Sequence, residues 1–165
     1  MKIKLLIMSV LFVPIIGCDR ITKEQAVIHL KGQDILSYAG GIFNLTYYEN
    51  TGGMISLGEN LPESLRFILF TLLVGVVLLA GLIYALKKPM PKLSLVLCLI
   101  FLAGGFGNFY DRVVNDGRVV DFMLIQLGPL RTGVFNVADI AITAGFIGII
   151  AITSQWGQKL PKKGS

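Results

Sequence analysis

The sequence has little charge for its length, and this shortage excludes a soluble domain. Charged residues account for 15% of the 165 positions, whereas hydrophobic residues account for 54%, and the mean hydropathy is +0.73. A soluble domain of this size needs a more polar surface than these residues supply. We therefore predict a small integral membrane protein in which residues 1–165 form a single domain.

Histidine and cysteine are also scarce, which excludes several catalytic classes. The single histidine, His29, lies in a polar segment with no serine or cysteine aimed at it, and no HExxH or CxxC pattern occurs. Cys18 and Cys98 are expected at membrane depths about 20 Å apart, too far for a disulfide. We predict no metal site and no cofactor.

Long runs without charge are abundant. Three of them contain 18 to 20 residues each, at 67–86, 93–110 and 140–158. A helix rises about 1.5 Å per residue, so each run can cross a hydrocarbon core of about 30 Å. A shorter run, residues 5–18, spans if its helix continues. The predicted fold class is an all-α membrane protein with four transmembrane helices, at about 3–25, 64–86, 92–110 and 137–158.

Basic and acidic residues are divided between the two ends of these spans. Eight lysines flank one end: Lys2, Lys4, Lys87, Lys88, Lys92, Lys159, Lys162 and Lys163. All ten acidic residues fall within 19–66 and 111–139. Positive flanks mark the cytoplasmic side, so we predict cytoplasmic termini and extracytoplasmic segments at 26–63 and 111–136. The net charge of +5 then reflects topology, and no nucleic-acid partner is expected.

The two extracytoplasmic segments contain β-prone pieces. In the first, glycine, asparagine and aspartate separate short pieces such as residues 42–48, and the second contains a similar piece at 119–122. This pattern is typical of strands and turns. We therefore predict a small extracytoplasmic β-sheet element beside the helices.

The amino terminus has two interpretations. A basic start, a short apolar run and Ile15-Ile16-Gly17-Cys18 imitate a lipoprotein signal peptide, with Cys18 as the lipidated residue of an anchored structural lipoprotein. Against this, Asp19 and Lys23 are spaced i, i+4 on a helix that continues past Cys18, so they can pair. We favour a retained first span.

Ionisable residues cost about 2.5–3.5 kcal/mol each at the centre of a membrane helix, so those at the membrane edge need a reason. Asp121 has apolar neighbours, and Asp139 follows Asn136, a natural helix N-cap, at the third helical position. If the two carboxyl groups meet, one pKa rises and the pair shares a proton, as in aspartic proteases. Asp111 is expected to need a cationic partner, the candidates being Arg112, Arg118 and Lys23.

Five motifs follow one another along the chain. They are Asp19-Arg20-Ile21-Thr22-Lys23, Glu49-Asn50-Thr51-Gly52, Gly104-Gly105-Phe106-Gly107-Asn108-Phe109-Tyr110-Asp111-Arg112, Val119-Val120-Asp121-Phe122 and Phe135-Asn136-Val137-Ala138-Asp139. In identity and order they resemble the motifs of the lipoprotein signal peptidases, the type II signal peptidase family. The resemblance covers nearly the whole chain and includes the four-span layout.

The resemblance implies an intramembrane aspartic endopeptidase that cleaves diacylglyceryl-modified prolipoproteins just before the lipid-bearing cysteine, with Asp121 and Asp139 as its catalytic dyad. Substrate-binding residues implied by the resemblance are Asn50, Asn108, Arg112 and Asn136, and supporting residues are Asp19, Lys23, Asp111 and Ala138. It also implies the bacterial cytoplasmic (inner) membrane, an extracytoplasmic active site, contact with membrane lipid and inhibition by globomycin.

The chain departs from the family pattern at three places. Arg20 stands where the family usually has Gln, Gly53-Met54-Ile55-Ser56 replaces Ala-Ala-Phe-Ser, and residues 115–118 contain a one-residue enlargement. These differences concern the substrate-side loop and leave the dyad intact. An alternative function is a small proton- or ion-coupled membrane protein whose acids form a relay. A relay predicts acids distributed through the bilayer depth, whereas these spans are bare between their ends.

Overall fold

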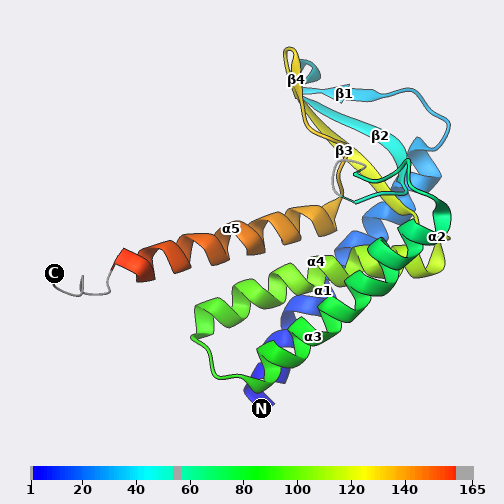
Figure 1. The fold of residues 1–165 in the computed structure, drawn as a ribbon. Helices are drawn as coiled ribbons and strands as arrows, with labels where there is room; N and C mark the ends of the chain where they lie inside the picture. The colour runs from blue at the N-terminus through cyan, green and yellow to red at the C-terminus, as the bar shows by residue number, and fades with distance from the viewer. Residues whose placement is uncertain (1, 54–56, 159–165) are drawn as a thin grey trace, which may run out of the picture.

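Four long helices and one small sheet make up the chain in the computed structural model, which describes residues 2–53 and 57–158 (Figure 1). The first helix is α1 (Lys2–Leu30), the second is continuous through α2 (Glu63–Arg66), the π-helical η3 (Phe67–Leu73) and α3 (Val74–Lys87), and the others are α4 (Lys92–Val114) and α5 (Val137–Gln158). All four are long and apolar enough to cross a membrane. The predicted fold class is confirmed.

Two helices extend beyond the predicted spans. α1 continues to Leu30 instead of ending near residue 25, and α4 continues to Val114 instead of ending near residue 110. The additional turns of α1 pack against the sheet, where Ala26 and Leu30 are buried with Val120 and Phe122. Removal of these side chains from water stabilises α1 beyond the length that a membrane span needs.

The sheet has four antiparallel strands in the order β1-β2-β3-β4. They are β1 (Leu36–Tyr38), β2 (Phe43–Asn50), β3 (Val119–Leu127) and β4 (Leu130–Arg131), with a 3₁₀ turn, η1 (Ala39–Gly41), between β1 and β2. The central pair, β2 and β3, joins the two predicted extracytoplasmic segments, 26–63 and 111–136. Its register shifts between Leu45 and Tyr48, and such a bulge bends a strand and re-aims its side chains.

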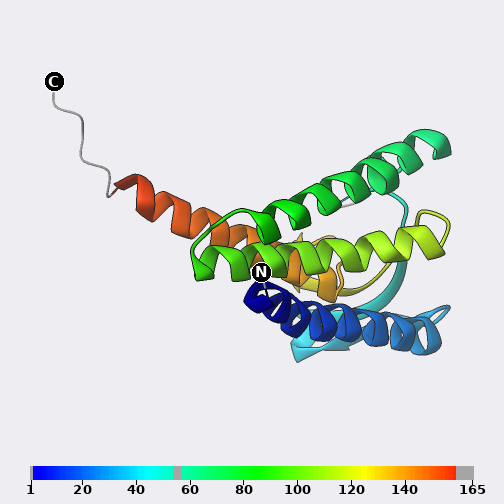
Figure 2. The same cartoon turned by 90° about the horizontal axis from the view of Figure 1, so that it is seen from below.

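α4 is the central helix and contacts α1, α3 and α5 (Figure 2). A Cβ atom on Gly104 would lie 2.4 Å from the carbonyl oxygen of Ala138, and a Cβ atom on Gly107 would lie 2.9 Å from Oδ2 of Asp19. Only a residue without a side chain allows these approaches. The two glycines therefore bring α1, α4 and α5 together at one level.

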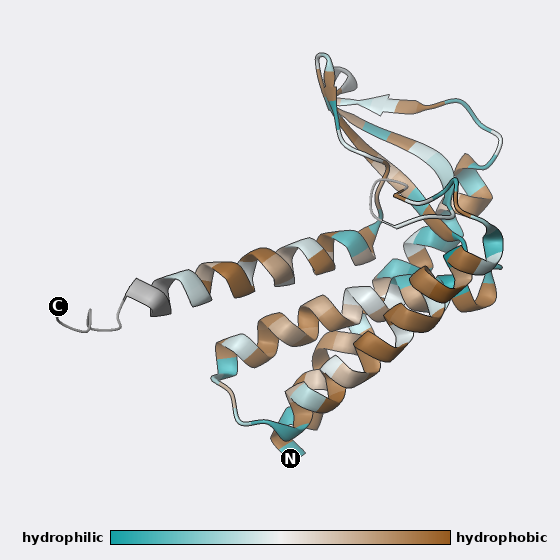
Figure 3. Cartoon of the chain, viewed as in Figure 1, coloured by the Kyte–Doolittle hydropathy of each residue, from teal (hydrophilic) through white to brown (hydrophobic). Residues whose placement is uncertain are grey.

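The two ends of the bundle differ in character. Hydrophobic residues make up most of the length of the helices, and hydrophilic residues gather near the sheet and at the opposite end (Figure 3). At the end opposite the sheet, Nζ of Lys4 donates hydrogen bonds to the carbonyl oxygens of Ala85 at 2.8 Å and Lys88 at 2.5 Å. A cation is favoured there because the last carbonyl groups of a helix carry partial negative charge. The lysines after residue 158 lie outside the described residues.

Candidate active site

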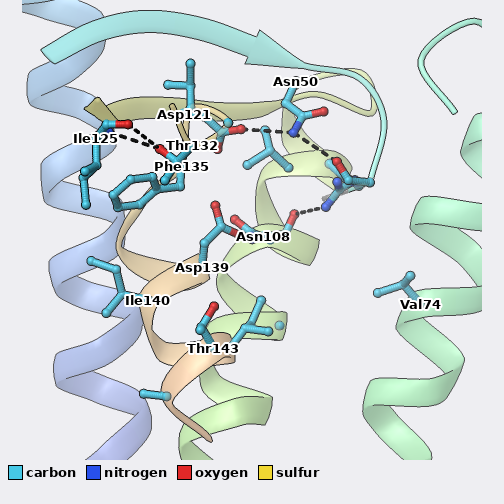
Figure 4. A pocket seen from close by; sticks show the side chains of 18 of the residues that line it. Asn50, Val74, Asn108, Asp121, Ile125, Thr132, Phe135, Asp139, Ile140 and Thr143 are labelled. Atoms are coloured by element: carbon cyan, nitrogen blue, oxygen red, sulfur yellow. Dashed lines mark hydrogen bonds between the residues drawn. The ribbon is translucent and has the colours of Figure 1, made fainter. Parts of the chain in front are cut away.

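One cavity of about 770 Å³ lies between the sheet and the neighbouring ends of α4 and α5 (Figure 4). Its lining includes both Asp121 and Asp139, so the fold brings together two carboxyl groups separated by 18 positions in the sequence. Apolar side chains from the helices line another part of the same cavity: Val74, Ile140, Ile142 and Ile147. The cavity therefore combines a polar end with an apolar wall.

Asp121 is held on β3 by two asparagine amides. Its side chain is buried, with Oδ2 accepting a hydrogen bond of 3.0 Å from Nδ2 of Asn50 and Oδ1 accepting one of 2.6 Å from Nδ2 of Asn136. Asn50 is oriented in turn, because its Oδ1 accepts from the backbone N–H of Gly52 at 2.9 Å. Each carboxyl oxygen of Asp121 thus has one fixed donor.

Asp139 is held in the first turn of α5 by reciprocal capping bonds. Oδ1 of Asn136 accepts from the backbone N–H of Asp139 at 2.9 Å, and Oδ2 of Asp139 accepts from the backbone N–H of Asn136 at 3.1 Å. This arrangement satisfies two donors at the start of the helix, and the predicted N-cap is confirmed. The remaining oxygen, Oδ1, accepts a hydrogen bond of 2.8 Å from Nδ2 of Asn108.

Two amide side chains connect the carboxyl groups. Asn136 donates to Asp121 and also to Oδ1 of Asn108 at 3.1 Å, while Asn108 donates to Asp139. The chain of donors therefore runs from one carboxyl group to the other through two neighbouring amides. Lys23 fixes the orientation of the Asn108 amide in this chain of hydrogen bonds, because its Nζ donates to Oδ1 of Asn108 at 2.9 Å.

A buried ionic cluster supports this chain from the side of α1. Lys23 lies 2.7 Å from Asp19 and 2.9 Å from Asp111, and all three side chains are buried. Oδ1 of Asp19 accepts a hydrogen bond of 2.9 Å from the backbone N–H of Ala138 in α5. Lys23 was among the predicted partners of Asp111. The second partner, Arg20 at 2.7 Å, was not predicted.

Arg112 joins the cavity to the loop that follows β2. Its Nη2 donates to the carbonyl oxygen of Gly52 at 2.6 Å, and its Nη1 donates to that of Asn108 at 3.4 Å. The Nε atom is buried and has no partner among the described residues. The guanidinium group therefore keeps a free donor beside Asn50 and Asp121, which line the same cavity.

The environment of Asp121 favours its protonated form. Its pKa is raised from the usual 3.8 to about 7, first because burial disfavours the charged carboxylate and second because of the negative charge of Asp139. Hydrogen bonds from Asn50 and Asn136 act in the opposite direction. Near neutral pH, this carboxyl group can therefore hold or release a proton.

Glu49, the residue before Asn50, is held in its charged form. Hydrogen bonds from Tyr47, Lys31 and Arg118 lower its pKa to about 2. The bonds from Lys31 at 3.1 Å and Arg118 at 2.8 Å tie the end of α1 and the start of β3 to β2. Glu49 thus fixes the backbone that carries Asn50.

No group of three or more His, Cys, Asp or Glu side chains within residues 2–53 and 57–158 is arranged to hold a metal ion. The residues around the cavity instead provide amide donors, one guanidinium group and two carboxyl groups. Such a set suits proton transfer and the binding of a peptide backbone.

Comparison with known proteins identifies the family. A family model described as signal peptidase II matches residues 11–155. The chain belongs to the signal peptidase II family. Members of this family are proteases, and the four apolar helices agree with a multi-pass bacterial membrane protein.

Curated relatives of the signal peptidase II family support the assignment. A lipoprotein signal peptidase of Streptococcus thermophilus is 37% identical over 139 residues, which cover 84% of this chain and 86% of the relative. One of Francisella tularensis is 34% identical over 151 residues, covering 91% of each chain. This chain is thus similar to both over most of its length.

Two solved structures, each described as a bacterial membrane enzyme, share the fold. One has a TM-score of 0.75 and 26% identity, with 100% of this chain and 96% of the other covered. The second has a TM-score of 0.76 and 27% identity, with 93% of each chain covered. The arrangement of helices and sheet is therefore that of known membrane enzymes.

The departures from the signal peptidase II pattern have different structural outcomes. Arg20 pairs with Asp111, donates to Glu24 at 3.2 Å and lies 4.8 Å from the ring centre of Tyr110. The enlargement at 115–118 forms the turn after α4, in which Asp116 and Gly117 both have positive φ. Residues 54–56 of the altered loop lie outside the described residues.

Two features of the site were not predicted from the sequence, namely the role of Arg20 and the apolar wall of the cavity. Arg20 had a detectable signal, because Asp111 would otherwise share Lys23 with Asp19 and leave one buried negative charge uncompensated. No signal in the sequence indicated the apolar wall of the cavity. Ile140 and Ile147 belong to a helix that is apolar on every side, so their spacing does not distinguish a cavity face from a lipid-facing one.

Proposed function

We propose that this protein is an aspartic endopeptidase that removes signal peptides from diacylglyceryl-modified prolipoproteins by cleaving before the lipidated cysteine. The observation that carries the proposal is the shared cavity of Asp121 and Asp139, in which every carboxyl oxygen accepts one amide hydrogen bond. Fixed amides leave the remaining lone pairs of both groups available to a substrate and a water molecule.

In the proposed reaction, Asp121 carries the proton that the pair shares. The carboxylate of Asp139 removes a proton from water, the water oxygen attacks the scissile carbonyl carbon, and Asp121 donates its proton to the carbonyl oxygen. The resulting tetrahedral intermediate breaks its C–N bond as the proton on Asp139 passes to the leaving nitrogen and the proton of one hydroxyl returns to Asp121. The raised pKa of Asp121 supports its role as the acid.

The polar residues around the pair have two kinds of role in this proposal. Asn50 and Arg112 contact the substrate backbone from the side of the sheet, while Asn108 and Asn136 contact the reacting groups and hold both carboxyl groups in place. The buried cluster of Asp19, Lys23, Asp111 and the backbone of Ala138 supports them. Burial of the cluster against α4 and α5 is the observation that favours this division.

The substrate is proposed to enter sideways from the lipid, with its acyl chains along the apolar wall of the cavity. Val74 and Ile147 on separate helices contribute to this wall. The lysines at the end opposite the sheet support cytoplasmic termini and an active site on the extracytoplasmic side of the bacterial inner membrane. Globomycin is expected to occupy the space between the carboxyl groups and so to block cleavage.

The direct test uses purified full-length protein and a lipid-modified prolipoprotein. We expect Asp121→Asn and Asp139→Asn each to abolish cleavage while the protein remains folded in detergent, and globomycin to inhibit the unchanged protein. Mass analysis of the released peptide would locate the cut, and mass analysis of the intact enzyme would show whether the first span and Cys18 are retained unmodified. Near-normal cleavage by either variant would refute the aspartic mechanism.

The distribution of buried charge argues against an ion- or proton-coupled function. Within the described residues, the buried charged side chains are Asp19, Lys23, Asp111 and Asp121, and all lie near the sheet. A relay across the bilayer needs ionisable groups at several depths. Proton flux through reconstituted vesicles that depends on Asp139, without any cleavage, would support the alternative instead.

A further inference from the structure

A second cavity, of about 630 Å³, lies beside the site just described and shares Arg112 with it. Its lining comes from the beginning of the second span, through Glu63, Arg66 and Phe67, and from the end of α4, through Val113 and Asp116. Two spans that start and end together mark the level where a membrane meets water. Whatever occupies this cavity is therefore at the depth of lipid headgroups.

Two arginines at this cavity lack an acidic partner. Arg66 donates to the backbone oxygen of Glu59 at 2.7 Å and to the hydroxyl of Thr51 at 3.4 Å, and Arg112 donates to backbone oxygens. Among the described residues, the ion pairs within 4.0 Å include neither of them. Both guanidinium groups thus retain donors and a full positive charge, which suits a phosphate.

Two carboxylates at the same cavity lack a basic partner. Neither Glu63 nor Asp116 takes part in an ion pair within the described ranges, and both are exposed. The third arginine that lines the cavity, Arg118, is already paired with Glu49 at 2.8 Å. Among the described residues, the charges at the cavity that form no ion pair are therefore two positive and two negative, which complements a ligand that carries one charge of each sign.

The sides of the cavity are apolar where they continue along the helices. Phe67 is 54% exposed and Val113 is 58% exposed, although both lie within helices of the membrane-spanning set. Exposed apolar side chains next to charged groups are suited to contact with the acyl chains of a lipid. The occupant should thus have a charged head at the cavity and hydrocarbon alongside the helices.

We propose that this cavity binds the headgroup of a phosphoethanolamine phospholipid. The phosphate is held by Arg66 and Arg112, and the primary ammonium group is held by Glu63 and Asp116. A choline headgroup carries the same charges, but its quaternary nitrogen has no N–H to donate to the carboxylates. A glycerol headgroup leaves both carboxylates without a cation. The inference concerns lipid recognition beside the proposed peptidase site, with which it shares the guanidinium group of Arg112.

The proposal is tested by lipid retention. The full-length protein, purified in detergent, would be incubated with an equimolar mixture of phosphatidylethanolamine, phosphatidylcholine and phosphatidylglycerol of identical acyl chains, and bound lipid counted by native mass spectrometry. We expect one phosphatidylethanolamine per protein, retained about tenfold over each of the other two, the size of effect expected for one charge-assisted hydrogen bond. Equal retention of the three lipids would overturn the proposal.

Variants test separately the arginines proposed to bind the phosphate and the carboxylates proposed to bind the ammonium group. Arg66→Gln should reduce phosphatidylethanolamine retention about tenfold, whereas Arg131→Gln, which removes an exposed arginine in β4, should not change it. Glu63→Gln combined with Asp116→Asn should retain phosphatidylethanolamine and phosphatidylcholine equally and bind more phosphatidylglycerol, because the cavity becomes net positive. Asparagine tolerates the positive φ of Asp116. If this double variant still prefers phosphatidylethanolamine to phosphatidylcholine, the proposed binding of the ammonium group by the two carboxylates is wrong.

Two further measurements guard against simpler explanations. Thermal unfolding of each variant in the same detergent should match that of Arg131→Gln. If Arg66→Gln unfolds early, the double variant decides the matter alone, because Glu63 and Asp116 form no ion pair with any described residue. Soluble phosphoethanolamine should compete only weakly. If it binds as tightly as the phospholipid, the apolar contacts contribute nothing and the assignment to a membrane lipid is wrong.

Discussion

The ammonium group of Lys23 donates a hydrogen bond of 2.9 Å to the side-chain oxygen of Asn108, 85 positions further along the chain. With its oxygen engaged in this way, the Asn108 amide must turn its nitrogen toward Asp139, to which it donates at 2.8 Å. A buried cation on α1 thus determines the donor that one proposed catalytic carboxyl group receives.

Replacement of Lys23 should destabilise the fold. In Lys23→Met, Asp19 and Asp111 lose the cation between them, and the loss of one partner from a buried pair costs about 3–5 kcal/mol. Lys31→Met is the matched control, because Lys31 is exposed and solvent weakens its ion pair with Glu49, so this variant should unfold close to the unchanged protein. Denaturant unfolding in mixed micelles measures both, and equal stability of the two variants would contradict the supporting role of Lys23.

Removal of the Asn50 amide should slow the reaction and shift its pH dependence. Asn50→Ala leaves a buried carboxyl oxygen of Asp121 without its donor, which costs about 1–3 kcal/mol, so kcat/KM should fall about 5- to 150-fold. Because that bond lowers the pKa of Asp121, its loss raises this pKa further and moves the alkaline limb of the pH–rate profile to higher pH.

Asn44 provides the control for this experiment. It is a second buried asparagine of β2, but its side chain bonds to Ser37 and to the backbone of Gly41 and is absent from the lining of the site cavity. Asn44→Ala should leave the shape of the pH profile unchanged. A shifted alkaline limb in Asn44→Ala would show that general loosening of the sheet, and not the amide of Asn50, sets the profile.

The unchanged enzyme should lose activity as pH rises through about 7. Asp121 is the proposed acid, its pKa lies near 7, and the protonated fraction falls about tenfold for each pH unit above that value. The expected alkaline limb of kcat/KM therefore has a midpoint near pH 7. Initial rates between pH 5 and 9, with a substrate that has no titrating group in this range, measure it. Full activity maintained at pH 9 would exclude Asp121 as the acid.

The contact between α4 and α5 should tolerate no added methyl group. In Gly104→Ala the new Cβ would lie 2.4 Å from the carbonyl oxygen of Ala138, so the first turn of α5 must move, together with Asp139. Overpacking of this kind costs about 1–3 kcal/mol, and cleavage should slow more than stability alone explains. Gly17→Ala is the control, since a Cβ atom there would have no atom within 4 Å apart from its chain neighbours and the nearby backbone of its own helix. An alanine there should leave cleavage unchanged.

The helices could be predicted from the sequence, because they depend on residues that are close together in the chain. Uncharged runs predicted the helices, since only a helix satisfies its own backbone in lipid. Asn136 before Asp139 predicted the start of α5, because capping depends on residues only three positions apart. The ends of α1 and α4 were predicted less well, because contacts with the sheet extend α1 past the length that hydropathy reports.

The membrane class, the number of spans and the residues able to do chemistry could all be predicted from the sequence, since composition and short-range spacing are properties of the chain alone. Three relationships depend on how the helices and the sheet pack together. Asp121 and Asp139 line one cavity, Arg20 and Lys23 both pair with Asp111, and the side-chain nitrogen of Asn108 faces Asp139. These relationships join α1, α4, α5 and the sheet across tens of positions, and they depend on how closely Gly104 and Gly107 allow the helices to approach. Hydropathy and residue spacing contain no measure of that distance.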